Sequence, residues 1–197
     1  MKKSMTYLAI VGVLVSLILS SGCSDDITIE SNTYYEDLVA KGWRLLQRWD
    51  FYNELDGWNH KTITRKNSGG FVKVEDGVLE FGYSKNGGIV FFQNKVRSRP
   101  NTSYMIVARI KTLNPFRAMV GFFSPEQKDK ASGQYWLRGA VRVRHSDWQI
   151  VKSVLSLDPN SGVKKPKRLF PAIQNISRHD YTYVDWMELW VFPKQKR

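Results

Sequence analysis

The stretch YTYVDWMELWVF, residues 181–192, decides the fold class of this chain. With the two-residue period of a strand, the odd-numbered residues from Tyr183 to Val191 fall on one face and the even-numbered residues from Val184 to Phe192 on the other. Both faces carry large apolar side chains, so we expect a strand that is covered on both sides or lines a binding surface. Such a strand at the end of an alternating chain predicts a β-sandwich closed by its C-terminus.

The remainder of the chain after residue 42 has the same character. Further candidate strands are residues 43–51, 59–66, 71–75, 78–84, 88–96, 103–113, 117–124, 134–144, 148–157 and 168–176. Turn-forming residues separate them, and Asp76-Gly77 between two alternating runs is typical of a tight hairpin. Residues 34–41 could form two turns of helix. The pattern therefore predicts an all-β, antiparallel jelly-roll β-sandwich over residues 43–197.

Composition limits the partners of this domain. The 197 residues are 42% hydrophobic, which suits one domain with a sizeable core, and the net charge is +12. A basic surface attracts nucleic acid, anionic lipid or acidic polysaccharide. The single cysteine excludes a disulfide within the chain.

The N-terminus indicates export. Residues 1–22 have the two lysines, apolar run and small-residue end of a signal peptide. The ending Ser20-Ser21-Gly22-Cys23 resembles the lipobox of bacterial lipoproteins, in which the cysteine is diacylated and becomes the new N-terminus. Residues 23–42 would then comprise the lipidated Cys23, a tether and the short helix. The alternatives are an ordinary cleaved signal or a retained anchor.

This resemblance implies a location and a partner. A lipid on Cys23 would hold the protein on a membrane in the bacterial cell envelope, with the outer membrane or cell surface favoured because Ser24 follows the cysteine. An extracytoplasmic protein would not meet nucleic acid. Acidic polysaccharide is then the polyanion that the basic charge favours.

Four segments resemble carbohydrate-binding modules of the galactose-binding-like jelly-roll type: residues 49–58 (WDFYNELDGW), 100–112 (PNTSYMIVARIKT), 147–157 (DWQIVKSVLSL) and 183–191 (YVDWMELWV). The resemblance implies a jelly roll that binds carbohydrate without catalysis. It also implies a structural calcium where the first and last strands meet, with Asp50 and Asp185 at the matching places. The alternative is a buried Asp185 whose carboxylate accepts from backbone N–H groups.

A second resemblance concerns residues 51–58 and 69–81, which are similar to the start of concanavalin-like jelly-roll domains, some of them glycoside hydrolases. Glycoside hydrolysis requires two carboxyl groups facing one cleft. The nearest pairs, Glu54 with Asp56 and Glu75 with Asp76, sit at expected turns, where acidic residues are ordinary. An enzyme is therefore the less favoured alternative.

Tryptophan and arginine side chains are the candidate glycan ligands, because flat rings suit sugar C–H faces and guanidinium groups suit carboxylate or sulfate. Alternation places Trp136, Arg138 and Arg142 on one face of strand 134–144, Arg109 and Lys111 on one face of strand 103–113, and Trp186 with Trp190 on one face of the last strand. If these faces belong to one sheet, they form a cationic platform. Trp58 and Trp148 begin strands near loops and are further candidates.

The sequence thus predicts a membrane-anchored lipoprotein that binds polysaccharide, with an acidic glycan favoured. One rival is a structural or assembly lipoprotein whose basic, aromatic face binds an envelope protein. The other is a small polysaccharide-degrading enzyme.

Overall fold

The computed structural model describes residues 34–52, 54–55, 57–62, 71–82, 88–92, 96, 98–125, 137–157, 168–176 and 180–193. The predicted signal peptide, Cys23 and Trp136 lie outside these residues. The chain divides into two compact units, residues 1–42 and 43–197. Residues 34–40 of the first unit are helical. No helix in the described part of the chain is long and apolar enough to cross a membrane.

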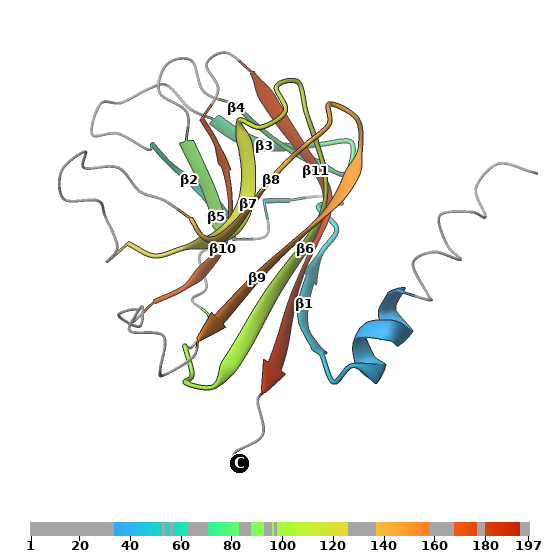
Figure 1. Ribbon diagram of the computed structural model, residues 1–197. Coiled ribbons are helices and arrows are strands. Elements are labelled where there is room, and N and C mark those ends of the chain that lie inside the picture. Colours follow the sequence, from blue (N-terminus) through green and yellow to red (C-terminus); the bar gives the residue numbers. More distant parts are fainter. Residues whose placement is uncertain are drawn as a thin grey trace, which may run out of the picture. The chain divides into compact units, whose positions relative to one another are not determined.

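The second unit is an antiparallel β-sandwich (Figure 1). Its strands are β1 (Arg44–Trp49), β2 (Trp58–Thr62), β3 (Phe71–Glu75), β4 (Val78–Gly82), β5 (Gly88–Phe92), β6 (Thr102–Thr112), β7 (Ala118–Phe123), β8 (Arg138–Arg142), β9 (Gln149–Leu157), β10 (Phe170–Asn175) and β11 (Tyr181–Pro193). One sheet has six strands in the order β3-β4-β11-β6-β9, with β1 also paired to β11; the other has five in the order β2-β5-β10-β7-β8. The predicted fold class is confirmed.

Strand β11 organises the six-stranded sheet. Along one edge it pairs with β6 from Thr182 to Pro193. Along the other edge it pairs first with β4, at residues 181–184, and then with β1, at residues 187–191. The strand is long enough to pair with three neighbours. The prediction that both of its faces are covered is met from Met187 to Val191, which are all buried, whereas Tyr183, Asp185 and Trp186 are partly exposed.

A β-bulge interrupts β11 between Val184 and Trp186, which pair with the consecutive residues Ile110 and Arg109 of β6. Asp185 is the extra residue. Two residues of a bulged strand oppose one on the partner, so the inward and outward faces change phase there. Val184 and Met187 both point into the core. The strict alternation predicted across residues 183–191 is therefore wrong at this point.

The core lies between the two sheets and contains the inward side chains of both. Trp49 and Trp58 meet edge to face with ring centroids 5.5 Å apart, and Phe51 packs on Trp58 at 5.8 Å. The sheets approach each other where β8 crosses β9, and the Ser153 hydroxyl donates to the Gly139 carbonyl at 2.6 Å. A Cβ at Gly139 would lie 2.7 Å from the Val154 carbonyl oxygen, so the crossing requires glycine.

Within the described residues, turn chemistry and alternation located nearly all of the strands correctly; the predicted strand ends at 63–66, 83–84 and 93–95 lie outside them. The Asp76-Gly77 hairpin is confirmed, with both residues at positive φ, 50° and 76°. The main difference is the predicted strand 134–144, of which only Arg138–Arg142 is a strand within the described residues. Gly139 adopts φ 59° and breaks the alternation on which the predicted face of that strand depended.

Candidate functional site

A row of side chains crosses the outer face of the six-stranded sheet, away from the core. Lys73 of β3 is opposite Glu80 of β4, Glu80 is opposite Tyr183 of β11, and Tyr183 is opposite Lys111 of β6. Trp148 continues the row, because it directly precedes β9, whose Gln149 pairs with Ile110. Strand register alone thus brings an acid, a base and two aromatic rings together.

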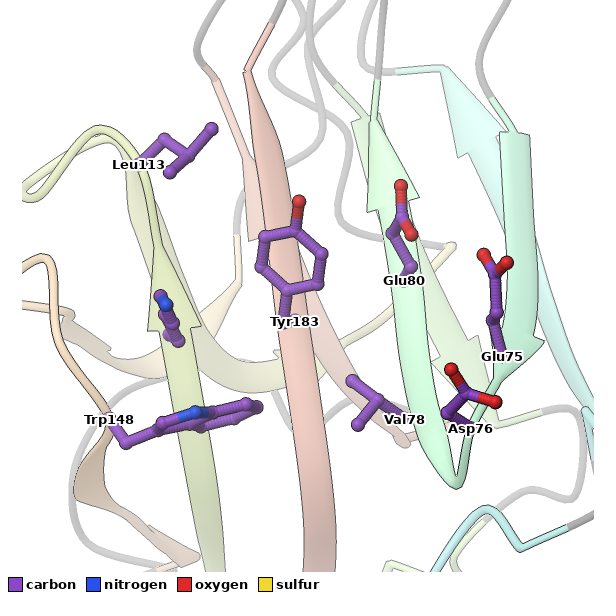
Figure 2. Close-up of a pocket in the computed structure, with 8 residues that line it drawn as sticks. Glu75, Asp76, Val78, Glu80, Leu113, Trp148 and Tyr183 are labelled. Carbon is purple, nitrogen blue, oxygen red and sulfur yellow. The ribbon is translucent and has the colours of Figure 1, made fainter.

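A pocket of about 350 Å³ lies along this row, and Glu75, Asp76, Val78, Glu80, Lys111, Leu113, Trp148 and Tyr183 line it (Figure 2). Figure 2 shows the Tyr183 ring in the middle, with Trp148 and Leu113 to one side and the three carboxylates to the other. The pocket therefore has an aromatic half and an acidic half. Its size is at the lower end of the range for small-molecule sites.

Trp148 and Tyr183 form the aromatic half. Trp148 is 36% exposed. The segment before it is held by hydrogen bonds to the Gln149 side chain. The Gln149 amide donates to the His145 carbonyl at 2.7 Å, and its oxygen accepts from the Arg144 N–H at 3.1 Å. Tyr183 is half-buried, and burial, followed by the nearby charge of Glu80, raises the pKa of its phenol. The phenol is therefore neutral at physiological pH and can both donate and accept.

The acidic half is held by the β3–β4 hairpin. Because Asp76 occupies its tight turn, its carboxylate lies at the rim of the pocket (Figure 2). Lys73 forms ion pairs with Glu75 and, at 3.4 Å, with Glu80. The hydrogen bond from Lys73 lowers the pKa of Glu75. The Glu75 carboxylate is thus ionised near neutral pH and can accept hydrogen bonds from ligand hydroxyl groups.

Beside the pocket, Arg109 joins Trp148 to the β11 bulge. Its guanidinium lies over the Trp148 ring, 5.2 Å from the centroid, and donates to the Asp185 carboxylate. Both Asp185 and Trp186 contact side chains on this outer face, as expected when two residues of a bulge oppose one partner.

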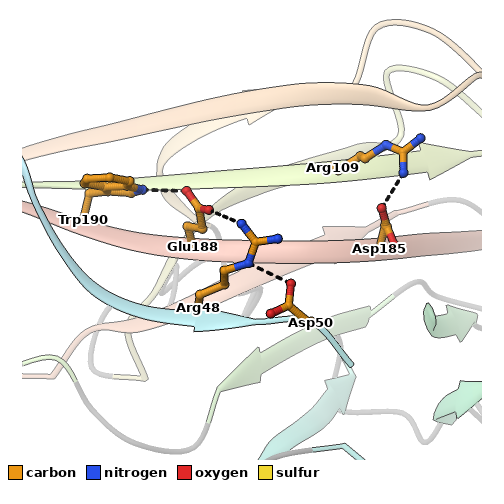
Figure 3. Close-up of polar contacts among 6 residues, drawn as sticks. All are labelled: Arg48, Asp50, Arg109, Asp185, Glu188 and Trp190. Carbon is orange, nitrogen blue, oxygen red and sulfur yellow. Dashed lines mark hydrogen bonds and ion pairs between the residues drawn. The ribbon is translucent and has the colours of Figure 1, made fainter. Parts of the chain in front are cut away.

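A second arginine contacts Trp186 on the other side of β11. Arg48 lies over that ring, also at 5.2 Å, and donates to Asp50 at 2.7 Å and to Glu188 at 2.8 Å. The Glu188 side chain is fully buried and also accepts from Trp190 Nε1 at 2.8 Å (Figure 3). This network links β1 to β11 and does not line the pocket.

The platform predicted from the sequence is not formed as one surface. Arg138 and Arg142 belong to β8 in the five-stranded sheet, whereas Trp186 and Trp190 belong to β11 in the six-stranded sheet. Trp190 is fully buried, and Trp58, at 2% exposure, is in the core. Of the predicted tryptophans, Trp148 is the one that lines the pocket among the described residues.

The residues predicted to bind calcium do not fit that role in the described structure. Asp50 is paired with Arg48 and Asp185 with Arg109, so each carboxylate already faces a guanidinium. The described residues include no cluster of three or more His, Cys, Asp or Glu side chains that could hold a metal. Two carboxylates that each face a guanidinium do not begin the cage of six to eight oxygens that calcium prefers.

Several pocket residues were not singled out from the sequence: Glu80, Leu113, Val78 and Tyr183 as a ligand-facing ring. Their grouping depends on the register of β4, β11 and β6, which no local motif records. The shared face of Arg109 and Lys111 was a correct partial signal, because Arg109 contacts Trp148 and Lys111 lines the pocket.

The sequence matches no protein-family model, and a search of curated proteins finds no significant match. Solved structures do match. The CBM22-1 xylan-binding domain of Paenibacillus barcinonensis Xyn10C is 13% identical, with a TM-score of 0.50, covering 78% of this chain and 97% of that one. The CBM22-1–CBM22-2 tandem of the same enzyme is 14% identical, with a TM-score of 0.52, covering 78% and 46%. A cyclase from Fischerella sp. TAU is 12% identical, with a TM-score of 0.45, covering 78% and 90%. The likeness to the CBM22 domains shows that this chain shares the β-sandwich fold of carbohydrate-binding modules.

Proposed function

We propose that this chain is a lipid-anchored protein of the bacterial cell envelope whose β-sandwich binds carbohydrate without catalysis, in the pocket beside Trp148 and Tyr183. The pocket carries this proposal. Two aromatic rings offer apolar surface to the C–H face of a sugar, and charged groups beside them can bind its hydroxyl groups. The fold that this chain shares with carbohydrate-binding modules supports the same conclusion.

The charges in the pocket bear on the kind of sugar. Glu75, Asp76 and Glu80 line it together with a single lysine, Lys111. A uronate or sulfate would be repelled by the acidic half, so a neutral sugar suits this pocket better. The preference for acidic polysaccharide expected from the net charge of +12 is a separate proposal, and it concerns the basic surface outside the pocket.

The carboxylates of the pocket serve binding better than hydrolysis. A glycoside hydrolase needs one carboxyl group whose pKa is raised, so that it can protonate the leaving oxygen. Lys73 has the opposite effect on Glu75, whose pKa is lowered. We therefore assign Glu75 to the acidic rim and not to acid catalysis.

The anchoring proposal rests on the lipobox-like ending at Cys23. Mass spectrometry of the protein exported by a bacterial host should find the N-terminal peptide beginning at Cys23 and carrying diacylglycerol. A peptide that begins elsewhere, or an unmodified cysteine, would show that the protein is not anchored to a membrane through Cys23.

The binding proposal is tested with the purified full chain in mild detergent. We would measure its affinity for soluble xylan, cello-oligosaccharides, polygalacturonate and alginate, at low and physiological salt. We expect a neutral glycan to bind at physiological salt and Trp148→Ala to weaken it about tenfold or more. The matched control is Trp186→Ala, which removes an equivalent ring from outside the pocket.

Each outcome separates the rival functions. Signals that are weak for every glycan and disappear with salt would indicate nonspecific charge and turn the search toward an envelope protein partner. Selective binding of the acidic glycans, unaffected by Trp148→Ala, would move the site away from this pocket. Release of reducing ends during incubation would identify an enzyme.

A further inference from the structure

The orientation of the Trp148 indole depends on more than its own segment of the chain. Residues 143–148 form no regular strand, and the Gln149 hydrogen bonds fix their backbone without touching the ring. The ring itself extends over β6, where the Arg109 guanidinium lies over its face. Arg109 lies over the ring but is not among the residues that line the pocket.

Arg109 is itself held in place. Its backbone pairs with β11 on one side and with β9 on the other, in the middle of the sheet. Its guanidinium donates to Asp185, the extra residue of the β11 bulge (Figure 3). A planar guanidinium fixed by a carboxylate has little freedom to rotate away from the ring that it covers.

We propose that Arg109 and Asp185 are positioning residues: they hold the Trp148 indole as a preformed wall of the pocket, so that a ligand does not pay for ordering it. The effect on the ring follows from the contacts alone. The effect on affinity rests on the proposed function. Binding to a side chain that is already ordered avoids the entropy cost of immobilising it, and this is how the pair would strengthen binding.

The Arg48 network provides a matched comparison within the same sheet face. Arg48 also covers a tryptophan at 5.2 Å and also binds carboxylates, but its ring, Trp186, does not line the pocket. If an arginine on this face only increased solubility or general stability, replacing either arginine would affect Trp148 equally. If Arg109 positions Trp148, only the replacement of Arg109 would do so.

The test uses ¹⁹F NMR of the full chain labelled with 5-fluorotryptophan. The Trp148 resonance is assigned by its loss in Trp148→Phe. We expect Arg109→Gln to shift and broaden this resonance, Asp185→Asn to do the same to a smaller extent, and Arg109→Lys to fall between Arg109→Gln and the wild type. Arg48→Gln should move the Trp186 resonance instead, and thermal melts would identify any variant that does not fold.

The affinity for xylohexaose is measured on the same variants. We expect Arg109→Gln to bind about two- to fivefold more weakly, the loss expected for one exposed cation–π contact. An unchanged Trp148 resonance in folded Arg109→Gln would overturn the proposal, as would an equal response to Arg48→Gln. If the wild type binds neither xylohexaose nor any other glycan, the proposed function fails, and the Trp148 resonance still decides whether Arg109 positions the ring.

Discussion

Two arginine–tryptophan stacks occupy the same face of the six-stranded sheet, on opposite sides of β11. In each, the guanidinium lies 5.2 Å from the ring centroid and donates to a carboxylate. They differ in depth: the Glu188 side chain bound by Arg48 is fully buried, whereas the Asp185 side chain bound by Arg109 is 32% exposed. A guanidinium, a carboxylate and an indole thus join β1 to β11 at Arg48, whereas at Arg109 they leave the indole facing the pocket.

The difference in depth follows from the neighbours of β11. Glu188 is paired on both sides, with Arg48 of β1 and Val107 of β6. Asp185 lies where the pairing with β4 has ended at Val184 and the pairing with β1 begins at Met187. The bulge therefore lies where a carboxylate can reach a central arginine and still meet water.

The largest expected effect is on stability, at the stack whose carboxylate is buried. Arg48→Met would leave the Glu188 carboxylate buried without its cation, which should lower the free energy of unfolding by about 3 kcal/mol. Arg109→Met should cost less than about 1 kcal/mol, because Arg109 and Asp185 are both partly exposed. Urea denaturation measures both, provided that the slope with denaturant is unchanged.

A double variant checks the cause. Glu188→Gln removes the buried charge and keeps an oxygen that can accept from Trp190 Nε1, so Arg48→Met/Glu188→Gln should be more stable than Arg48→Met alone. If the two arginine variants lose equal stability, or the double variant is the less stable, burial is not what distinguishes the stacks.

Much of the fold could be predicted from the sequence, because alternation and turn residues are local signals. The Asp76-Gly77 turn and the final strand were read correctly for that reason. The bulge at Asp185 was not, because YVDWM alternates without any mark of an extra residue. The predicted face of strand 134–144 was wrong for a related reason. A glycine at positive φ, here Gly139, changes which side chains share a face, and the sequence does not say which glycines adopt a positive φ.

The candidate site could be predicted only in part. Trp58 and Trp148 both begin strands near turns, and nothing local distinguishes them. What distinguishes them is tertiary: Trp58 points between the sheets and packs on Trp49, whereas Trp148 lies on the outer face. Glu80, Tyr183 and Lys111 are neighbours only through the pairing of strands that are distant in sequence. Likewise, the three carboxylates of the pocket cannot be predicted from the net charge of the chain, which is +12.

A smaller effect is expected from deleting Asp185. The deletion would place Val184 next to Trp186 and restore regular pairing with β6, with inward and outward faces unchanged on both sides. We expect a folded protein that is less stable by about 1 kcal/mol, and in which the Arg109 stack is perturbed and the Arg48 stack is not. Circular dichroism, urea denaturation and the ¹⁹F spectrum measure these three properties.

The matched control deletes Leu189, where the pairing of β11 with β6 is regular. That deletion turns every following side chain to the opposite face and should prevent folding. If deleting Asp185 is as damaging as deleting Leu189, the bulge is required for the sandwich itself, and the exposed stack is not separable from the fold.

The smallest expected effect concerns the phenol on the pocket side of β11. Burial and the Glu80 charge raise the Tyr183 pKa above its ordinary 10.0, so the unfolded chain releases this proton first as the pH rises. Tyr183 therefore contributes stability that is complete below pH 10.0 and is lost as the pH passes through the folded-state pKa. Between pH 10 and 11, the wild type should lose more stability than Tyr183→Phe in urea denaturation, while from pH 7 to pH 9 the two curves should run parallel.

Subtracting the Tyr183→Phe curve removes the contribution of the other tyrosines to the pH dependence, including that of Tyr104, whose pKa is also raised by burial. Identical curves above pH 10 would mean that water solvates this phenol as well in the folded protein as in the unfolded chain. The Tyr183 side of β11 would then be as accessible to water as the carboxylate of Asp185.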